Sequence, residues 1–221
     1  MNIVNVFTDK LGKYGNPLGI IIDEKKFFNK VKRQQIALAS GFSEIVFINN
    51  IQKRDISIFS PQREIPFAGH AVIGAAYFLD QEYKKPVKQL ISMRTKIKTW
   101  AKNRLMWVRG DLSITPPWNL EQVVNTLQLE KITVKQASSK KHTLIWSWID
   151  KNKAIIRART FASDWGISED EANGSGAMKL TIKLGRDLTI HHGQGSVIYT
   201  KISTISGFID LGGRVRVIKR E

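Results

Sequence analysis

The segment at 69–79, GHAVIGAAYFL, limits the possible folds more than any other part of the sequence. It has the length and composition of a helix, and after its histidine it is apolar on every side, whereas a surface helix keeps a polar face. Such a helix must be enclosed, and a sheet wrapped around it would enclose it. A second glycine-led helix, GSGAMKLTIKL, is predicted at 174–184. We therefore predict an α+β fold of two similar lobes.

The remaining elements are predicted from short apolar runs that end at turn residues. The predicted strands are 2–8, 18–23, 44–49, 55–60, 89–98, 104–109, 143–149, 153–161, 196–203 and 207–218. A surface helix is expected at 25–39, with Phe28, Val31 and Leu38 on its apolar face, and another at 119–129. We place the N-terminal lobe at 1–105 and the C-terminal lobe at 106–221, and the last strand could return to the first lobe.

Cysteine is absent from all 221 residues. Its absence excludes disulfides, thiolate nucleophiles, zinc–thiolate sites and racemase mechanisms that need two thiols. No run approaches the roughly 20 apolar residues that cross a bilayer. The first ten residues alternate in polarity, as a strand does, and do not resemble a secretory signal. These features predict a cytoplasmic protein that does not enter a membrane.

The chain carries a formal net charge of +16, from 35 Lys and Arg against 19 Asp and Glu. A field of this size attracts nucleic acid, acidic protein surfaces and anionic metabolites alike. The basic residues are scattered, and no basic run is interleaved with aromatics as in a nucleic-acid motif. Two interpretations remain open: a solvated basic surface, or a nucleic acid or acidic partner that no motif identifies.

The starts of the two glycine-led helices are candidate anion sites, because a helix N-terminus presents free N–H groups and a positive dipole end. If the two starts faced each other, they could hold a small carboxylate between them. The residues that line this site would be Gly69, His70, Gly174 and Ser175. The alternative is that both glycines belong to ordinary helix caps.

Three ionisable residues are candidates for acid/base chemistry. Glu44 lies among apolar residues, which raise the pKa of a carboxyl group towards neutrality, although it could also point to solvent from an edge strand. His70 opens an apolar helix and must be hydrogen-bonded or functional. Asp170 could act in the site, or it could be an acidic residue that the positive end of the helix dipole favours before a helix. His142, His191 and the adjacent His192 lack metal-ligand spacing, so no metal site is predicted. Nucleotide-binding and serine-hydrolase motifs are also absent.

Five segments, in order, resemble the PhzF or phenazine biosynthesis-like family, and together they span most of the chain. They are VFTDKLGKYGNPLGII (6–21), GFSEIVFI (41–48), SPQREIPFAGHAVIGAAYFL (60–79), RTFASDWGISEDEANGSGAMKL (159–180) and GFIDLGGRVRVI (207–218). The resemblance implies the diaminopimelate epimerase-like fold, in which each of two lobes is a curled, mostly antiparallel sheet around a central helix and the active site lies between the lobes. It also implies a homodimer.

By motif, the family's principal acid/base matches Glu44, its assisting histidine matches His70, and the acid before the second helix matches Asp170. Its contacts to the substrate carboxylate match Gly69, Gly174 and Ser175. The best-known reaction of the family is the isomerisation of trans-2,3-dihydro-3-hydroxyanthranilate, a proton shift that needs no cofactor. Related epimerases on this fold use two cysteines, a mechanism that is closed to this chain.

The sequence departs from the family pattern in the loop before the second helix. Asp-Pro-Ala-Thr-Gly-Ser becomes DEANGS at 170–175, so a proline and a hydroxyl are lost. The chain is also shorter than typical members of the family between residues 110 and 150 and around 191–199. We expect a cofactor-independent isomerase acting on a small carboxylate-bearing metabolite. Epimerisation by one base remains a second possibility, and a non-catalytic protein that binds nucleic acid or an acidic partner is a third.

Overall fold

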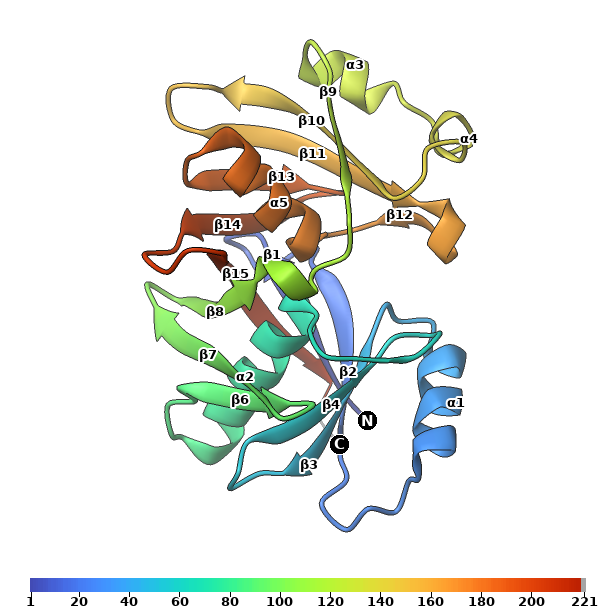
Figure 1. Cartoon of the computed structure of the whole chain (residues 1–221), viewed down its shortest axis with the longest axis vertical. Coiled ribbons are helices and arrows are strands. Elements are labelled where there is room, and N and C mark those ends of the chain that lie inside the picture. Colours follow the sequence, from blue (N-terminus) through green and yellow to red (C-terminus); the bar gives the residue numbers. More distant parts are fainter. Residues whose placement is uncertain (220–221) are drawn as a thin grey trace. The chain divides into compact units, whose positions relative to one another are not determined.

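The computed structural model describes residues 1–219, so Arg220 and Glu221 of the predicted second lobe lie outside the described part. The elements are labelled in Figure 1. The strands are β1 (Asn2–Thr8), β2 (Asn16–Ile22), β3 (Ile45–Asn50), β4 (Asp55–Phe59), β5 (Glu64–Ile65), β6 (Gln89–Ser92), β7 (Thr95–Lys102), β8 (Leu105–Asp111), β9 (Asn119–Gln122), β10 (Thr143–Asp150), β11 (Ile155–Ala162), β12 (Ile167–Asp170), β13 (Leu188–His192), β14 (Ser196–Ile202) and β15 (Phe208–Lys219). The α-helices are α1 (Lys30–Ser40), α2 (Gly69–Tyr83), α3 (Thr126–Glu130), α4 (Val134–Ala137) and α5 (Gly174–Leu184).

The chain forms two compact units. The first contains residues 1–6 and 17–110 together with the described residues from Gly212 onward. The second contains residues 7–16 and 111–211. The chain therefore passes from one unit to the other within β1, at the start of β2, near the end of β8 and again within β15.

In the first unit, the strand order is β1-β2-β3-β4-β6-β7-β8-β15, and β15 also pairs with β1. This last pairing closes the sheet on itself. Helix α2 is buried from Gly69 through Ala76, and Gly74 lies against Leu18, Val4 and Val6. Burial of apolar side chains on every side of α2 is what stabilises a helix of this composition. The predicted sheet wrapped around a helix is confirmed.

The second unit repeats the pairing pattern of the first. In the first unit, β2 is parallel to β3, β3 antiparallel to β4, β4 parallel to β6 and β6 antiparallel to β7. In the second unit, β9 is parallel to β10, β10 antiparallel to β11, β11 parallel to β13 and β13 antiparallel to β14. Helix α2 follows β4 and its short partner β5, while α5 follows β11 and its short partner β12. The prediction of two related α+β lobes is confirmed.

Helix α5 packs closely against its own unit. A Cβ atom at Gly174 would lie 2.9 Å from Leu211 Cδ2, and one at Gly176 would lie 2.9 Å from Leu144 Cδ1. Gly174 is therefore needed for close packing, whatever else it contacts. The helix has the predicted bounds, and it ends at Gly185 in the left-handed conformation that suits glycine.

Two predicted elements, the helix at 119–129 and the strand at 89–98, are wrong in detail. Residues 119–122 form β9, parallel to β10, so the helix expected at 119–129 begins only at Thr126. The strand expected at 89–98 is the hairpin β6–β7, which turns at Met93 and Arg94 with φ of 47° and 67°. Neither turn residue is the glycine or asparagine that normally marks such a turn, so the turn could not be predicted from the sequence.

The surface helix also differs from its prediction. Helix α1 begins at Lys30, capped by Asn29, which leaves Phe28 outside it. Val31 and Leu38, predicted on the buried face, are each 67% exposed. The inward face instead carries Arg33 and Ala37. In Figure 1, α1 lies outside the sheet, beside the strands that it contacts, β3 and β4.

Within residues 1–219, no helix is long and apolar enough to cross a membrane.

Candidate active site

Glu44 and His70 lie together in the first unit. Glu44 directly precedes β3, whose residues Ile45 to Ile48 are fully buried and fix the start of the strand. His70 is the second residue of α2. Oε2 of Glu44 lies 3.1 Å from Nε2 of His70, and the two side chains are 15% and 7% exposed. Since β3 is flanked by β2 and β4, it is no edge strand, and the alternative of a solvent-facing Glu44 is wrong.

Burial lowers the pKa of His70 to about 4, so the imidazole is neutral at pH 7. A neutral imidazole has one donor and one acceptor nitrogen, and the tautomer decides which nitrogen does which. Nε2 can therefore donate to a Glu44 carboxylate or accept from a Glu44 carboxylic acid. Within the described part of the chain, the two atoms are close but do not meet hydrogen-bond geometry. Glu44 is therefore a largely buried carboxyl group beside a neutral imidazole, a setting that suits a residue that takes up and returns a proton. The raised pKa expected for Glu44 itself stays a prediction.

Asp170 lies in the second unit, at the end of β12. Its Oδ1 accepts from Nδ2 of Asn16 at 3.0 Å and from the backbone N–H of Ala172 at 3.2 Å, and its Oδ2 accepts from Nδ2 of Asn173 at 2.9 Å. Removal from water raises the pKa of Asp170, and these hydrogen bonds oppose the rise without cancelling it. Asp170 is thus an oriented carboxyl group that holds a proton more readily than an exposed aspartate.

Asn173, the residue that replaces the family's hydroxyl, caps α5. Its Oδ1 accepts from the backbone N–H of Gly176 at 2.5 Å. The hydroxyl of Ser175 lies at the same helix start and accepts from Nε1 of Trp118 at 2.8 Å. The ring of Trp118 meets that of Trp165 edge to face, with centroids 5.0 Å apart. The aromatic pair of Trp118 and Trp165 therefore lies beside Ser175, a predicted substrate contact.

Glu171 replaces the family's proline and ties the loop before α5 to the β13–β14 turn. Its carboxylate accepts from the hydroxyl of Ser196 at 2.6 Å and from the backbone N–H of Gln194 at 2.8 Å. Buried His192 lies 2.9 Å from both the Glu171 carbonyl oxygen and the Thr160 hydroxyl. A carbonyl can only accept, so Nδ1 of His192 carries the proton and Nε2 accepts from Thr160. Hydrogen bonds thus hold a loop that lacks the usual proline.

The predicted site residues fall into two groups. Glu44, His70 and Gly69 lie in the first unit, and Asp170, Gly174 and Ser175 lie in the second. The sequence reasoning missed the residues that hydrogen-bond to the second group or to the loop that carries it: Asn16, Trp118, Asn173 and His192. Asn173 could have been found from the preference of asparagine for helix N-caps, but the others come from distant parts of the chain. Among the described residues, no group of three His, Cys, Asp or Glu side chains could hold a metal ion.

Comparison with known proteins bears on both groups. The family model described as phenazine biosynthesis-like protein matches residues 4–101, which include Glu44, Gly69 and His70. The resemblance to the PhzF family is confirmed. An uncharacterized isomerase of Pasteurella multocida is 24% identical over 81% of this chain and 75% of its own length. The trans-2,3-dihydro-3-hydroxyanthranilate isomerase of Pseudomonas aeruginosa is 27% identical over 81% of this chain and 78% of its own.

A solved structure extends the PhzF likeness to the fold of the whole chain. The crystal structure of a phenazine biosynthesis protein PhzF family member from Enterococcus faecalis matches with a TM-score of 0.78 at 18% identity. The match covers 99% of this chain and 98% of that one. Both units, including the part beyond residue 101, therefore have the PhzF fold.

Proposed function

We propose that this chain is an isomerase of the PhzF type that moves a proton between two carbon atoms of a small carboxylate-bearing metabolite, without a cofactor. Glu44 is the group that carries the proton. The observation on which the proposal chiefly rests is the 3.1 Å approach of Glu44 to a buried, neutral His70. The relatives named as isomerases support the same class of reaction.

In the proposed reaction, the carboxylate of Glu44 takes a proton from a carbon next to an unsaturated or carbonyl-activated centre. The electron pair that is left shifts the double bond, and the Glu44 carboxylic acid then delivers the same proton to the other end of the unsaturated system. Product and substrate have the same atoms and the same oxidation state. His70 would position Glu44 throughout, with its Nε2–H directed at Oε2 both before the transfer and after it, when Oε1 carries the substrate's proton.

The second group of residues is assigned to substrate binding. Asp170 would bind an amino or hydroxyl group of the substrate, and the starts of α2 and α5 would bind its carboxylate. The two helix starts differ, because Asn173 caps α5 whereas Ala68, the N-cap of α2, offers no side-chain hydrogen bond. The first turn of α2 at Gly69 is therefore the better candidate for the carboxylate contact.

Replacement of Glu44 by glutamine tests the proposal, because it keeps the shape of the side chain and removes the proton carrier. A panel of small carboxylate metabolites would be incubated with the protein in D₂O, and deuterium incorporation at carbon would be followed by mass spectrometry. We expect Glu44→Gln to lower the exchange rate about 10²- to 10⁴-fold, the usual contribution of a positioned acid/base.

The control for this experiment is Glu121→Gln, which removes a carboxylate from a surface ion pair with Lys140. It should exchange deuterium at the wild-type rate. The proposal fails if Glu44→Gln, folded by circular dichroism, exchanges as fast as the wild type.

A further inference from the structure

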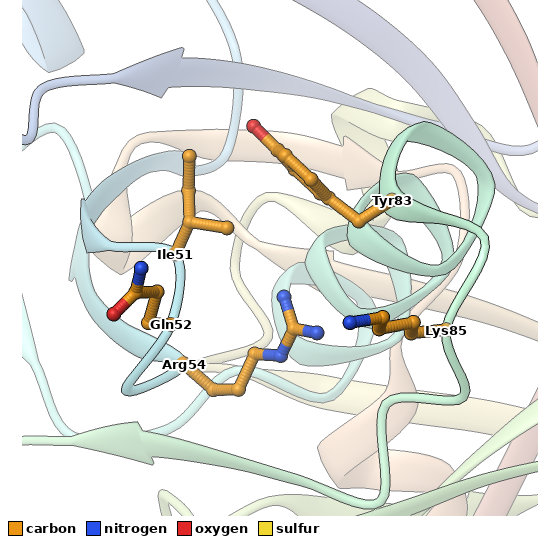
Figure 2. Close-up of a pocket in the computed structure, with 5 residues that line it drawn as sticks. All are labelled: Ile51, Gln52, Arg54, Tyr83 and Lys85. Carbon is orange, nitrogen blue, oxygen red and sulfur yellow. The ribbon is translucent and has the colours of Figure 1, made fainter.

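A pocket of about 400 Å³ lies in the first unit, and neither Glu44 nor His70 lines it. It is formed by the turn that joins β3 to β4 and by the C-terminal end of α2, as Figure 2 shows. The residues that line it are Ile51, Gln52, Arg54, Tyr83 and Lys85. Its volume falls within the range of pockets that hold small molecules.

The charges on the pocket wall are all positive. In Figure 2, the guanidinium of Arg54 and the ammonium of Lys85 point toward one another. Nη1 of Arg54 is buried and has no hydrogen-bond partner within the described part of the chain. Two cations that converge repel each other, and a buried N–H without a partner loses the hydrogen bond that it made to water in the unfolded chain. An anion between them would remove both costs.

Two carboxylates lie near the pocket without lining it. Glu24 accepts from the backbone N–H of Ile51 at 2.9 Å, which engages it in holding the turn. Burial raises the pKa of Tyr83, with smaller contributions from Glu24 and Glu82, while Arg54 opposes the rise. The phenol therefore keeps its proton at neutral pH and can donate a hydrogen bond.

We propose that this pocket binds a phosphate ester whose phosphate lies between Arg54 and Lys85 and whose organic group, preferably a ring, packs on Tyr83 and Ile51. A guanidinium fork binds two oxygens of one phosphate, and an ammonium adds a point charge. Two cations suit a group that carries a charge of about −1.5 to −2 at pH 7 better than they suit a carboxylate. The proposal is independent of the isomerase reaction, because neither Glu44 nor His70 lines the pocket.

Three probes separate the parts of the proposed ligand. Phenyl phosphate has the dianion and the ring, inorganic phosphate has only the anion, and benzoate has the ring with a single charge. Titrations would be followed by backbone amide shifts in NMR spectra of the ¹⁵N-labelled chain. We expect phenyl phosphate to bind most tightly and benzoate most weakly, with the largest shifts at Ile51, Gln52 and Tyr83.

The double variant Arg54→Gln/Lys85→Gln should weaken the binding of phenyl phosphate at least about tenfold. The matched control is Lys102→Gln/Arg104→Gln, which removes the same charge. Arg104 is exposed and has φ of 61°, close to the 58° of Arg54, so the backbone strain is alike. The control should bind as the wild type does.

Equal losses in both double variants would overturn the proposal, because they would show general attraction to the basic chain. Shifts confined to residues outside the pocket, such as Gly69 or Gly174, would overturn it as well. If the double variant does not fold, Lys85→Gln alone decides, since Lys85 is an exposed residue just beyond α2. That variant should weaken binding several-fold, and unchanged affinity would count against the site.

Discussion

Asn173 performs two tasks with one amide group. Its oxygen caps α5 at Gly176, and its nitrogen donates to Oδ2 of Asp170. A threonine, the residue of the family pattern, has one hydroxyl oxygen, which would have to accept for the cap and donate to the acid at once. The substitution therefore keeps the helix start and places the two hydrogen bonds on separate atoms of one amide.

Two variants of Asn173 separate these tasks. Asn173→Ala removes both and should lower the free energy of unfolding by about 0.5–2 kcal/mol, the usual cost of a lost N-cap. Asn173→Thr should keep most of that stability. Since the hydrogen bond from Asn173 lowers the pKa of Asp170, Asn173→Ala should raise that pKa further. Urea denaturation would measure the stability and ¹³C NMR the titration. Equal destabilisation by the two variants would contradict this account of the cap.

At the scale of the element, α1 shows how burial can contradict an apolar pattern. Arg33 is buried, with its Nη2 2.8 Å from Asp23 Oδ2, its Nη1 2.7 Å from Asn49 Oδ1 and its guanidinium 4.8 Å from the centre of the Phe47 ring. Leu38, a member of the predicted apolar face, is exposed. Helix α1 is thus held to the sheet through an arginine, with its aliphatic stem and planar head packed inside.

This packing predicts opposite results for two substitutions on α1. Arg33→Met should lower the free energy of unfolding by about 3 kcal/mol, because it leaves the fully buried Asp23 without its cation. Leu38→Ala should change it by less than about 0.5 kcal/mol, as expected of an exposed side chain. Chemical denaturation of both variants would check the prediction. If Leu38→Ala lowered the free energy of unfolding more than Arg33→Met did, the buried face predicted from the sequence would be correct after all.

The elements that the sequence predicted well are those whose own residues decide their structure. Helix α5 has a cap at each end, and β1 alternates in polarity, so both have the predicted bounds. The stretch at 119–122 is a strand because β10 pairs with it, and its sequence does not record that partner. The candidate site divides in the same way. Glu44 and His70 stand out in apolar surroundings, but the contact of Trp118 with Ser175 joins residues 57 apart.

At the scale of the whole molecule, each unit contains one buried neutral histidine, His70 in the first and His192 in the second. Burial lowers the pKa of both to about 4, whereas histidines of the unfolded chain titrate near 6.5. Between these values the unfolded state binds more protons, so the free energy of unfolding falls as the pH falls. Asp170 acts in the opposite sense, since burial raises its pKa. Its contribution to the free energy of unfolding is fully present below pH 3.8, the ordinary pKa of an aspartate. This contribution is lost as the pH rises through the pKa of Asp170 in the folded protein.

Acidification from pH 6.5 to 4.5 should therefore destabilise the protein steeply, by up to about 1.4 kcal/mol per pH unit for each of the two histidines. His70→Gln and His192→Gln should each remove one such contribution, whatever they do to stability at pH 7. Urea denaturation at a series of pH values gives the slope. If both variants keep the wild-type slope, the buried histidines do not cause the acid sensitivity.

Strand β15 has a consequence for the order of folding. Its residues from Phe208 to Leu211 belong to the second unit and those from Gly212 to the first, and the strand pairs with β1, β8 and β14. During synthesis, the first unit therefore waits for a strand made about 100 residues after β8, while the second unit emerges from the ribosome. Until then β1 and β8 have open edges, which are prone to pair with other chains. A nascent chain stopped before residue 212 should consequently depend on chaperones far more than one released after it.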